Sequence, residues 1–393
     1  MKTTHDVIIV GAGLIGAALA LRLSQETDLT IALVERAPQL SDKPSPNLRV
    51  VALGAVASEI LDCCGVLQEL GPQACHAYNA MHVWDESSSG QLSFSAQEQG
   101  LEQLGFMIDS LECTRQLQAK AAHSETIDEY FETQISALSM QHIGAVLSVK
   151  AKGSESTQLC ADLLIAADGG GSWVRRQAKI FANRLPYEQK GIVARISTSE
   201  PHQDTAWQRF LQTGPVAILP LADNQSSIVW SASNQRADEL LKLNTADFER
   251  ALSEALESKL GSVSLLSERV AFPLHSQRAE QYIKRHLALV GDAAHSIHPL
   301  AGQGANLGFK DVESLVQTLS SADGGNIGSL DVLKKYQRAR KADNEQTDLM
   351  MSALHKAYRN NDSAWITARG VGMNLISSSK TLKQLLVRHA IGQ

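Results

Sequence analysis

Residues 5–37 read HDVIIVGAGLIGAALALRLSQETDLTIALVERA, and this stretch decides the fold of the N-terminal part of the chain. The continuous apolar run at residues 7–10 is typical of a parallel strand that is buried on both faces. A helical pattern at residues 17–23 and a second apolar strand at residues 30–34 follow it. A strand, a helix and a strand over about 30 residues predict a βαβ unit and therefore an α/β fold.

Three glycines, Gly11, Gly13 and Gly16, follow the first strand in the pattern G-x-G-x-x-G. Gly11 permits a tight turn, Gly13 lets the backbone approach a pyrophosphate, and Gly16 lets the helix pack closely on the strand. Unpaired N–H groups at the start of the helix also attract phosphates. Together with Glu35 at the end of the second strand, the pattern predicts a dinucleotide site for NAD or FAD, because a carboxylate disfavours the 2′-phosphate of NADP. A glycine-rich packing turn is the alternative.

The composition limits the class of protein. With 393 residues, of which 44% are hydrophobic and 20% charged, the chain is expected to fold into two interlocked domains. Its net charge of −6 argues against nucleic acid as a partner. An odd number of cysteines without a C-x-x-C pair favours a reducing cytoplasm. No apolar run approaches the ~18 residues that a membrane-spanning helix needs.

A second strand-end pattern lies in the middle of the chain, where residues 159–169 read LCADLLIAADG. This apolar run predicts a strand that ends at Asp168. The sequence GGSWVRRQ follows, in which Ser172 is placed to cap a helix that carries Arg175 and Arg176.

The third pattern begins with a short apolar strand at residues 287–290, which runs into GDAAHSIHPLAGQGANLGFKD at residues 291–311. Gly291 and Asp292 therefore follow the carboxyl end of a strand, where doubly wound sheets bind ligands. His295 and His298 raise the alternative of a metal site, but no H-E-x-x-H motif or cysteine pair accompanies them, so no metal is predicted. The absence of G-x-S-x-G at a strand end argues against an α/β-hydrolase.

The three patterns together resemble the class A flavin-dependent aromatic hydroxylases, whose fold is that of p-hydroxybenzoate hydroxylase. Within that family, HVWDESSSGQLSF, GPVAILPL, SSIVWS and PLAGQGANLGFKD are most similar to the ubiquinone-biosynthesis hydroxylases, especially the 2-octaprenylphenol 5-hydroxylase type. The resemblance covers most of the chain. It implies a Rossmann-like FAD-binding domain, a second domain with an antiparallel sheet for the substrate, and C-terminal helices.

The resemblance also implies roles for single residues. Asp292 is expected to bind the ribityl chain of FAD, Arg49 to approach the pyrophosphate, and Asp168 to take part in binding FAD and nicotinamide. His298 is expected to face the flavin pocket, and His298 and Pro299 are the candidate catalytic residues; His295 is expected to position the loop. The backbone that lines the isoalloxazine is expected at Pro299, Ala301, Gly302, Gln303 and Gly304, with Asn306 opening the following helix.

Three positions depart from the family pattern. Ser110 stands where the family usually has Arg or Asn, so we expect that flavin contact to be weakened or supplied elsewhere. Cys113 replaces an aliphatic residue in the same helix. Val51 replaces a small polar residue beside Arg49.

The expected layout is discontinuous. Residues 1–75, 105–180 and 270–335 are predicted to form the FAD-binding domain. Residues 76–104 and 181–269 show the alternating pattern of antiparallel strands and are predicted to form the substrate domain. Residues 336–393 are predicted to be a helical C-terminal segment. Its end places apolar side chains near one side and basic ones elsewhere, which fits a helix packed on the core or a membrane or partner contact: Leu382, Leu385, Leu386, Ile391, Lys380, Lys383 and Arg388.

The activity that the resemblance implies is hydroxylation of a polyprenylphenol ring at C5 in ubiquinone biosynthesis, with noncovalent FAD, O2, and NADH or NADPH as a transient reductant. One alternative is hydroxylation of a soluble phenol or aromatic acid, and another is a non-catalytic flavoprotein subunit of a biosynthetic complex. A cytoplasmic protein that contacts the inner membrane peripherally, as a homo-oligomer or in a ubiquinone-biosynthesis complex, is expected.

Overall fold

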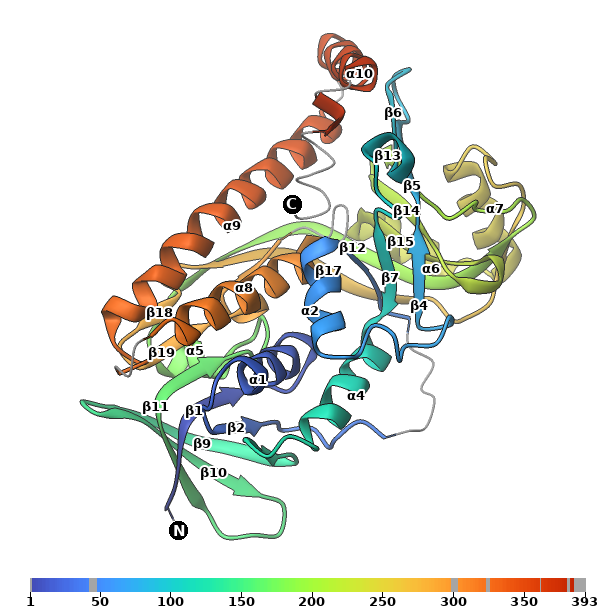
Figure 1. Cartoon of the computed structure of the whole chain (residues 1–393). Coiled ribbons are helices and arrows are strands. Elements are labelled where there is room, and N and C mark those ends of the chain that lie inside the picture. Colours follow the sequence, from blue (N-terminus) through green and yellow to red (C-terminus); the bar gives the residue numbers. More distant parts are fainter. Residues whose placement is uncertain are drawn as a thin grey trace.

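A computed structural model describes residues 2–41, 48–297, 303–322, 326–360, 362–379 and 382–384 (Figure 1). The N-terminal strand lies inside a mixed eight-stranded sheet. Five of its strands, β19, β11, β1, β2 and β8, are neighbours and run parallel, so their carboxyl ends lie along one edge. The main order is β18 (Ile283–Lys284), β19 (Leu287–Leu289), β11 (Thr157–Ala166), β1 (Lys2–Val10), β2 (Ile31–Val34) and β8 (Ile127–Tyr130).

The helix α1 (Leu14–Glu26) follows the glycine loop and contacts both α4 (Ser110–Ala121) and α8 (Gln303–Ser320). Apolar side chains of the sheet and these helices form one hydrophobic core. Helix α8 comes close to α1 because Gly308 has no side chain: a Cβ there would lie 2.7 Å from Ile15 Cδ1. The predicted βαβ unit and the α/β fold class are confirmed.

Two smaller sets of strands extend this body. The hairpin of β9 (Thr133–Gln141) and β10 (Gly144–Ala151) pairs antiparallel with β11. A three-stranded sheet joins β3 (Val50–Leu53), β7 (Gly105–Asp109) and β4 (Cys75–Tyr78), and α2 (Ala55–Cys63) follows β3.

The second large sheet has nine strands and is antiparallel except for the parallel pair of β5 and β13. The helices α6 (Asn234–Lys242) and α7 (Thr245–Ala255) cover a core that includes Trp230 and Phe248. Strand β17 falls within residues 270–335 but pairs with β12 in this sheet; the predicted domain boundaries stay a prediction. The main order is β20 (His295–Ser296), β17 (Val270–Ala279), β12 (Ala182–Thr198), β15 (Gln225–Ser233), β14 (Gly214–Pro220), β13 (Thr205–Leu211), β5 (Ala80–Asp85) and β6 (Gln91–Ser95), with β16 (Val263–Leu265) on β12.

The C-terminal part is helical, as predicted. Helix α9 (Leu330–Arg359) begins beside β18 and α10 (Ser363–Ser378) lies against β6 (Figure 1). The rings of Phe210 and Tyr358 stack at 3.7 Å and join the end of α9 to the nine-stranded sheet. Within the described ranges, no helix is both long and apolar enough to cross a membrane.

Candidate cofactor site at the carboxyl edge of the parallel sheet

Three predicted site residues follow neighbouring strands of the parallel sheet. Gly11 follows β1, Asp168 follows β11, and Asp292 follows β19. The strand pairing continues to this edge, where Val290 N–H donates a hydrogen bond to Ala166 O at 3.0 Å. Topology therefore brings together three segments that lie far apart in the sequence.

The glycine loop has the geometry that its spacing predicts. Gly11 has a φ of +104°, which L side chains rarely adopt. A Cβ on Gly16 would overlap the carbonyl oxygen of Gly11, so this glycine is needed for the close packing of α1. A Cβ on Gly13 would meet no atom within 4 Å. The backbone of Gly13 therefore borders open space at the start of α1, where unpaired helix N–H groups attract phosphates.

The peptide of Ala12 is held from both sides. Its N–H donates to Glu35 Oε2 at 2.9 Å, and its carbonyl accepts from Gln118 Nε2 at 2.7 Å. Glu35 Oε1 accepts from Ala37 N–H at 2.9 Å, and both carboxylate oxygens keep further lone pairs for ribose hydroxyls. Gln118 lies on α4 and was not predicted from the sequence. In the sequence, Gln118 stands out only as a polar residue at a helix position that faces the core.

Asp168 has one carboxylate oxygen engaged and one without a partner. Its Oδ2 accepts from the N–H groups of Trp173 and Val174, at 2.7 and 3.0 Å, and so caps the short helix α5 (Trp173–Gln177). Its Oδ1 is buried and has no hydrogen-bond partner among the residues that the structure describes. Because an unsatisfied buried acceptor costs about 1–3 kcal/mol, this oxygen suits a hydroxyl or N–H of a bound molecule. A Cβ on Gly169, Gly170 or Gly171 would also meet only open space.

The turn at Gly291–Ala293 (η2), which carries Asp292, is held by two side chains of other elements. Arg175 Nη1 donates to Ala293 O at 2.6 Å, and Gln277 Nε2 donates to Asp292 O at 3.3 Å. Both side chains also reach Gly170 O. Arg175 and Gln277 therefore join this turn to the loop after Asp168. Ser172 accepts from the N–H of Arg175 at 2.9 Å, as predicted for its cap.

Asn306 lies in the first turn of α8, near the helix start where it was expected. Its Oδ1 accepts from Gly54 N–H and its Nδ2 donates to Ala52 O, both at 2.9 Å. The amide thus fixes the turn between β3 and α2. At the start of α8, Gln303 is buried, and a Cβ on Gly304 would meet no atom within 4 Å.

The three departures from the family pattern have different surroundings. Ser110 Oγ donates to Arg49 O at 2.9 Å and joins the start of α4 to the exposed Arg49. Cys113 is buried in the core, and burial raises the pKa of its thiol well above the usual range. Val51 is half-buried in β3, opposite Ile108.

Four of the predicted site residues, His298, Pro299, Ala301 and Gly302, lie outside the described residues. His295 is described, and its Nε2 lies 2.5 Å from Asp311 Oδ2, on α8. This contact was not predicted, because nothing near Asp311 in the sequence indicates its partner.

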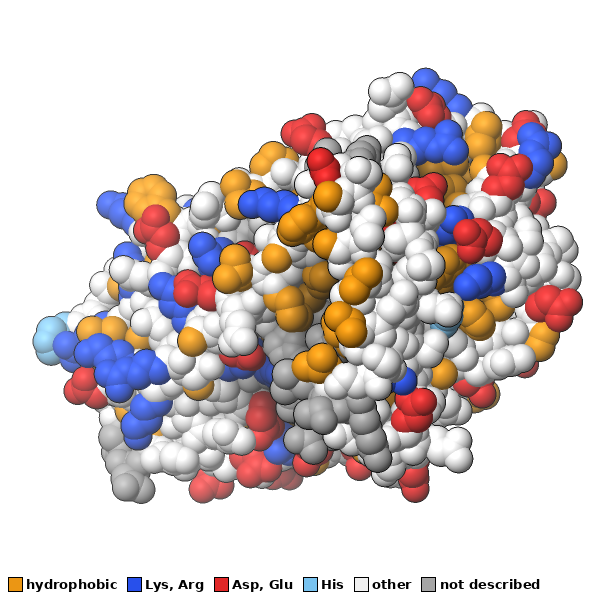
Figure 2. Space-filling model, turned by 90° about the horizontal axis from the view of Figure 1, so that it is seen from above, with side chains coloured by type: hydrophobic (Ala, Val, Ile, Leu, Met, Phe, Trp, Pro, Cys, Tyr) orange, Lys and Arg blue, Asp and Glu red, His pale blue; other side chains and the backbone are white. Residues whose placement is uncertain are grey.

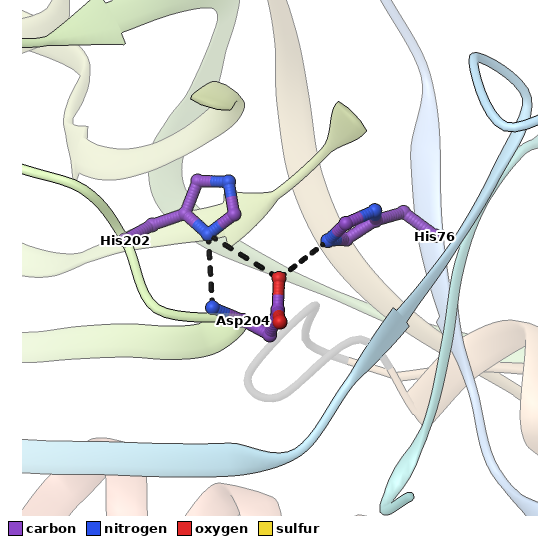
Figure 3. Close-up of side chains that lie close together, drawn as sticks. All are labelled: His76, His202 and Asp204. Carbon is purple, nitrogen blue, oxygen red and sulfur yellow. Dashed lines mark hydrogen bonds and ion pairs between the residues drawn. The ribbon is translucent and has the colours of Figure 1, made fainter. Parts of the chain in front are cut away.

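A second group of polar side chains lies away from this edge, where β4 meets the start of β13 (Figure 3). His76, His202 and Asp204 place one ligand-type atom each within 4.8 Å of one another. Hydrogen bonds account for this arrangement. His76 Nε2 lies 2.9 Å from Asp204 Oδ1; His202 Nε2 lies 2.9 Å from Leu221 O, and its Nδ1 accepts from Asp204 N–H at 3.0 Å. His202 is therefore a neutral ring that ties two loops together.

The His202 ring predicts a loss of stability on acidification. Its burial lowers its pKa, so the unfolded chain binds a proton at a higher pH than the folded chain does. The stabilisation from the neutral ring is complete above about pH 6.5, the ordinary histidine pKa, and is lost as the pH falls through the lowered value. We measure the urea concentration at which half of the protein is unfolded, between pH 7.5 and 5.5. This midpoint is expected to fall less with decreasing pH in His202→Gln than in the wild type. The exposed His142→Gln is the control, and equal slopes for wild type and His202→Gln would contradict the prediction.

Comparisons with known proteins agree with this geometry. The model of the family described as FAD binding domain matches residues 4–348. The 3-demethoxyubiquinol 3-hydroxylase of Escherichia coli (strain K12) is 34% identical, over 98% of this chain and 98% of that protein. The mitochondrial ubiquinone biosynthesis monooxygenase COQ6 of Danio rerio is 31% identical, over 98% of this chain and 89% of that protein.

Solved structures share the fold. The p-nitrophenol 4-monooxygenase PnpA of Pseudomonas putida DLL-E4 matches with a TM-score of 0.80 and 14% identity, over 100% of this chain and 99% of that one. PqsL of Pseudomonas aeruginosa, in complex with 2-aminobenzoylacetate, matches with a TM-score of 0.77 and 21% identity, over 95% of this chain and 100% of that one. By its family match and its relatives, the chain belongs to the FAD binding domain family and is an FAD-dependent monooxygenase akin to the ubiquinone-biosynthesis hydroxylases.

Proposed function

We propose that this chain hydroxylates the aromatic ring of a polyprenylphenol intermediate of ubiquinone biosynthesis at C5, with FAD, O2, and NADH or NADPH. The observation that carries the substrate class is the end-to-end match with a hydroxylase whose name places it on a ubiquinol precursor. The C5 position rests on the similarity of HVWDESSSGQLSF and SSIVWS to the 2-octaprenylphenol 5-hydroxylase type. That name specifies position 3 of a demethoxyubiquinol, so the same match favours hydroxylation there as a second candidate.

For the cofactor, we propose that the loop of Gly11, Gly13 and Gly16 holds the pyrophosphate and that Glu35 holds the adenosine ribose. The open space at Gly13 supports this. Arg49 would approach the pyrophosphate. When bound, FAD supplies the transfer of electrons from the nicotinamide and the activation of oxygen.

The unpaired Oδ1 of Asp168 and the fixed turn of Gly291 and Asp292 support hydrogen bonds to the ribityl chain. The start of α8 would lie at the flavin ring, where the positive end of a helix stabilises negative charge. The residues proposed around the ring are His298, Pro299, Ala301, Gly302, Gln303, Gly304 and Asn306.

We propose further that neither His295 nor His298 binds a metal ion, since His295 already contacts Asp311. Elemental analysis of the purified protein tests this. Stoichiometric zinc that disappears on replacing either histidine would contradict it.

Complementation tests the ring position. The gene is expressed in ubiquinone-making bacterial strains that each lack one hydroxylase, for C5, C1 or C6, or for the demethoxyubiquinol step where that is a separate enzyme. We expect ubiquinone to return in the C5 strain. Return only in the strain that accumulates demethoxyubiquinol would select the second candidate. If ubiquinone returned in no strain and the protein turned over a soluble phenol, the proposed substrate class would be wrong. If no substrate stimulated NAD(P)H oxidation, the protein would be a non-catalytic flavoprotein.

We also propose that the end of α9 and α10 contacts the membrane in which a polyprenyl substrate resides. Large apolar side chains are exposed there. Figure 2 views the molecule from the side on which α10 lies at the top of Figure 1, and it shows hydrophobic side chains gathered on this face. Each that enters the membrane surface adds binding free energy at about 25 cal/mol per Å² of buried area. They are Leu349, Leu354, Trp365, Val371, Leu375 and Leu382, with exposures of 36 to 71%.

Sedimentation with vesicles of neutral and anionic phospholipid tests the contact. The triple variant Leu349→Ser, Trp365→Ser, Leu375→Ser is expected to stay in solution while the wild type sediments. Ile143→Ser is the control, because Ile143 is 76% exposed at the turn between β9 and β10. A wild type that stays in solution as a dimer, or in complex with another ubiquinone-biosynthesis protein, would assign the surface to a protein partner.

A further inference from the structure

A buried carboxylate lies directly behind the turn that carries Asp292. Asp311, on α8, is fully buried. Its Oδ2 accepts a hydrogen bond from Gly291 N–H at 2.9 Å and lies 2.5 Å from His295 Nε2. Its Oδ1 accepts from Arg340 Nε on α9 at 2.9 Å. One carboxylate thus joins Gly291, at the start of the turn, and His295, just after the turn, to the helices α8 and α9.

The carboxylate is held in its charged form. Burial alone raises the pKa of Asp311, but His295 and Arg340 together bring it below the usual range. Arg340 is itself held by Asp343 Oδ2 at 2.7 Å and Asn344 Oδ1 at 2.7 Å. Arg340 and both of these partners lie on α9, so the guanidinium that holds Asp311 is itself fixed in place. Charge-assisted hydrogen bonds of this kind are roughly twice as strong as neutral ones.

The turn is therefore held from two sides. Asp311, on α8, binds Gly291 at the start of the turn and His295 just after it, and Arg175 on α5 and Gln277 on β17 bind carbonyl groups of the turn. Gly291, with a φ of +55°, has no side chain of its own to fix the turn.

We propose that Asp311 is a positioning residue of the flavin site, which holds Gly291 and His295 and thereby directs Asp292 toward the cofactor. This inference rests on the proposed role of the turn in FAD binding. Asp311 is fully buried and its carboxylate is engaged by protein groups, so it acts through the turn and not on the flavin.

The variant Asp311→Asn tests the inference. The amide NH2 would face a donor, either Arg340 Nε or Gly291 N–H, so the link to α9 or the link to the turn is lost. We expect FAD to dissociate at least tenfold more readily, measured by the recovery of flavin fluorescence on dilution. We also expect a larger share of NAD(P)H oxidation to end in hydrogen peroxide instead of hydroxylated product. His295→Gln is the milder variant: it leaves the ion pair with Arg340 intact and should fold even if Asp311→Asn does not.

The matched control is Asp85→Asn. Asp85 is another buried carboxylate, 1% exposed and paired with Arg369, but it lies in the nine-stranded sheet away from the turn. The inference holds if Asp311→Asn and His295→Gln weaken FAD binding tenfold while Asp85→Asn stays within twofold of the wild type. FAD affinities within twofold for both turn variants, or an equal loss in Asp85→Asn, would overturn it. If the wild type bound FAD but hydroxylated no ubiquinone precursor, the proposed function would be wrong. The inference about Asp311 would still be tested, because it depends only on the FAD affinities.

Discussion

A Gly13→Ala variant is expected to fold like the wild-type chain and to bind FAD at least tenfold more weakly. Its Cβ would touch no atom of the described residues within 4 Å. The backbone of Gly13, with φ −74° and ψ −173°, is also open to alanine. The added methyl group therefore enters only the space where we propose that the pyrophosphate lies. Overpacking costs about 1–3 kcal/mol, and a cost in the middle of that range, about 2 kcal/mol, corresponds to about thirtyfold in affinity.

The matched variant is Gly16→Ala, which differs by the same methyl group three residues later. Its Cβ would overlap Gly11 O, so α1 would have to move away from β1, and we expect insoluble or unfolded protein. Urea unfolding and flavin fluorescence separate the two effects. If Gly13→Ala kept the FAD affinity of the wild type, the glycine loop would not be the pyrophosphate site.

The parts of the site that the sequence predicts share one property: each is indicated by a pattern within one short stretch of the chain. The apolar run before Gly11 and those before Asp168 and Asp292 predict strands, and parallel strands in one sheet must end at a common edge. Strand β1 nevertheless begins at Lys2 and not at residue 7, because its polar first residues pair with β11. Pairing with a distant strand extended it where no local pattern indicates a strand.

The residues that hold the site in shape were not predicted, because their partners are distant in the sequence. Gln118 meets Ala12 across 106 residues, and Arg340 meets Asp311 across 29. A polar residue at a buried position indicates that it has a partner, since buried polar groups are hydrogen-bonded, but not which one. The fold alone supplies that choice. The same holds for His76 and His202, which come together only where β4 meets the start of β13.

Replacing Asp85 by alanine is expected to cost about 3–5 kcal/mol of unfolding free energy, because it leaves a buried guanidinium without its carboxylate. Arg369 Nε and Nη2 donate to the two oxygens of Asp85 at 2.9 and 3.0 Å, and the side chains are 8% and 1% exposed. Asp238→Ala removes the surface ion pair with Lys190 and should cost no more than about 1 kcal/mol. Urea unfolding of both variants measures the difference.

The loss should be concentrated in α10, because the contacts of Arg369 lie where this helix meets the nine-stranded sheet. Close approach adds to that contact: a Cβ on Gly90 would lie 2.9 Å from the Cα of Gly370. Hydrogen exchange in Asp85→Ala is therefore expected to quicken in residues 363–378 before it quickens in β1 or β11. Uniform quickening across the chain, or a cost equal to that of Asp238→Ala, would contradict the prediction. Since α10 carries Trp365 and Leu375 of the exposed apolar surface, its release should also weaken sedimentation with vesicles while the affinity for FAD stays that of the wild type.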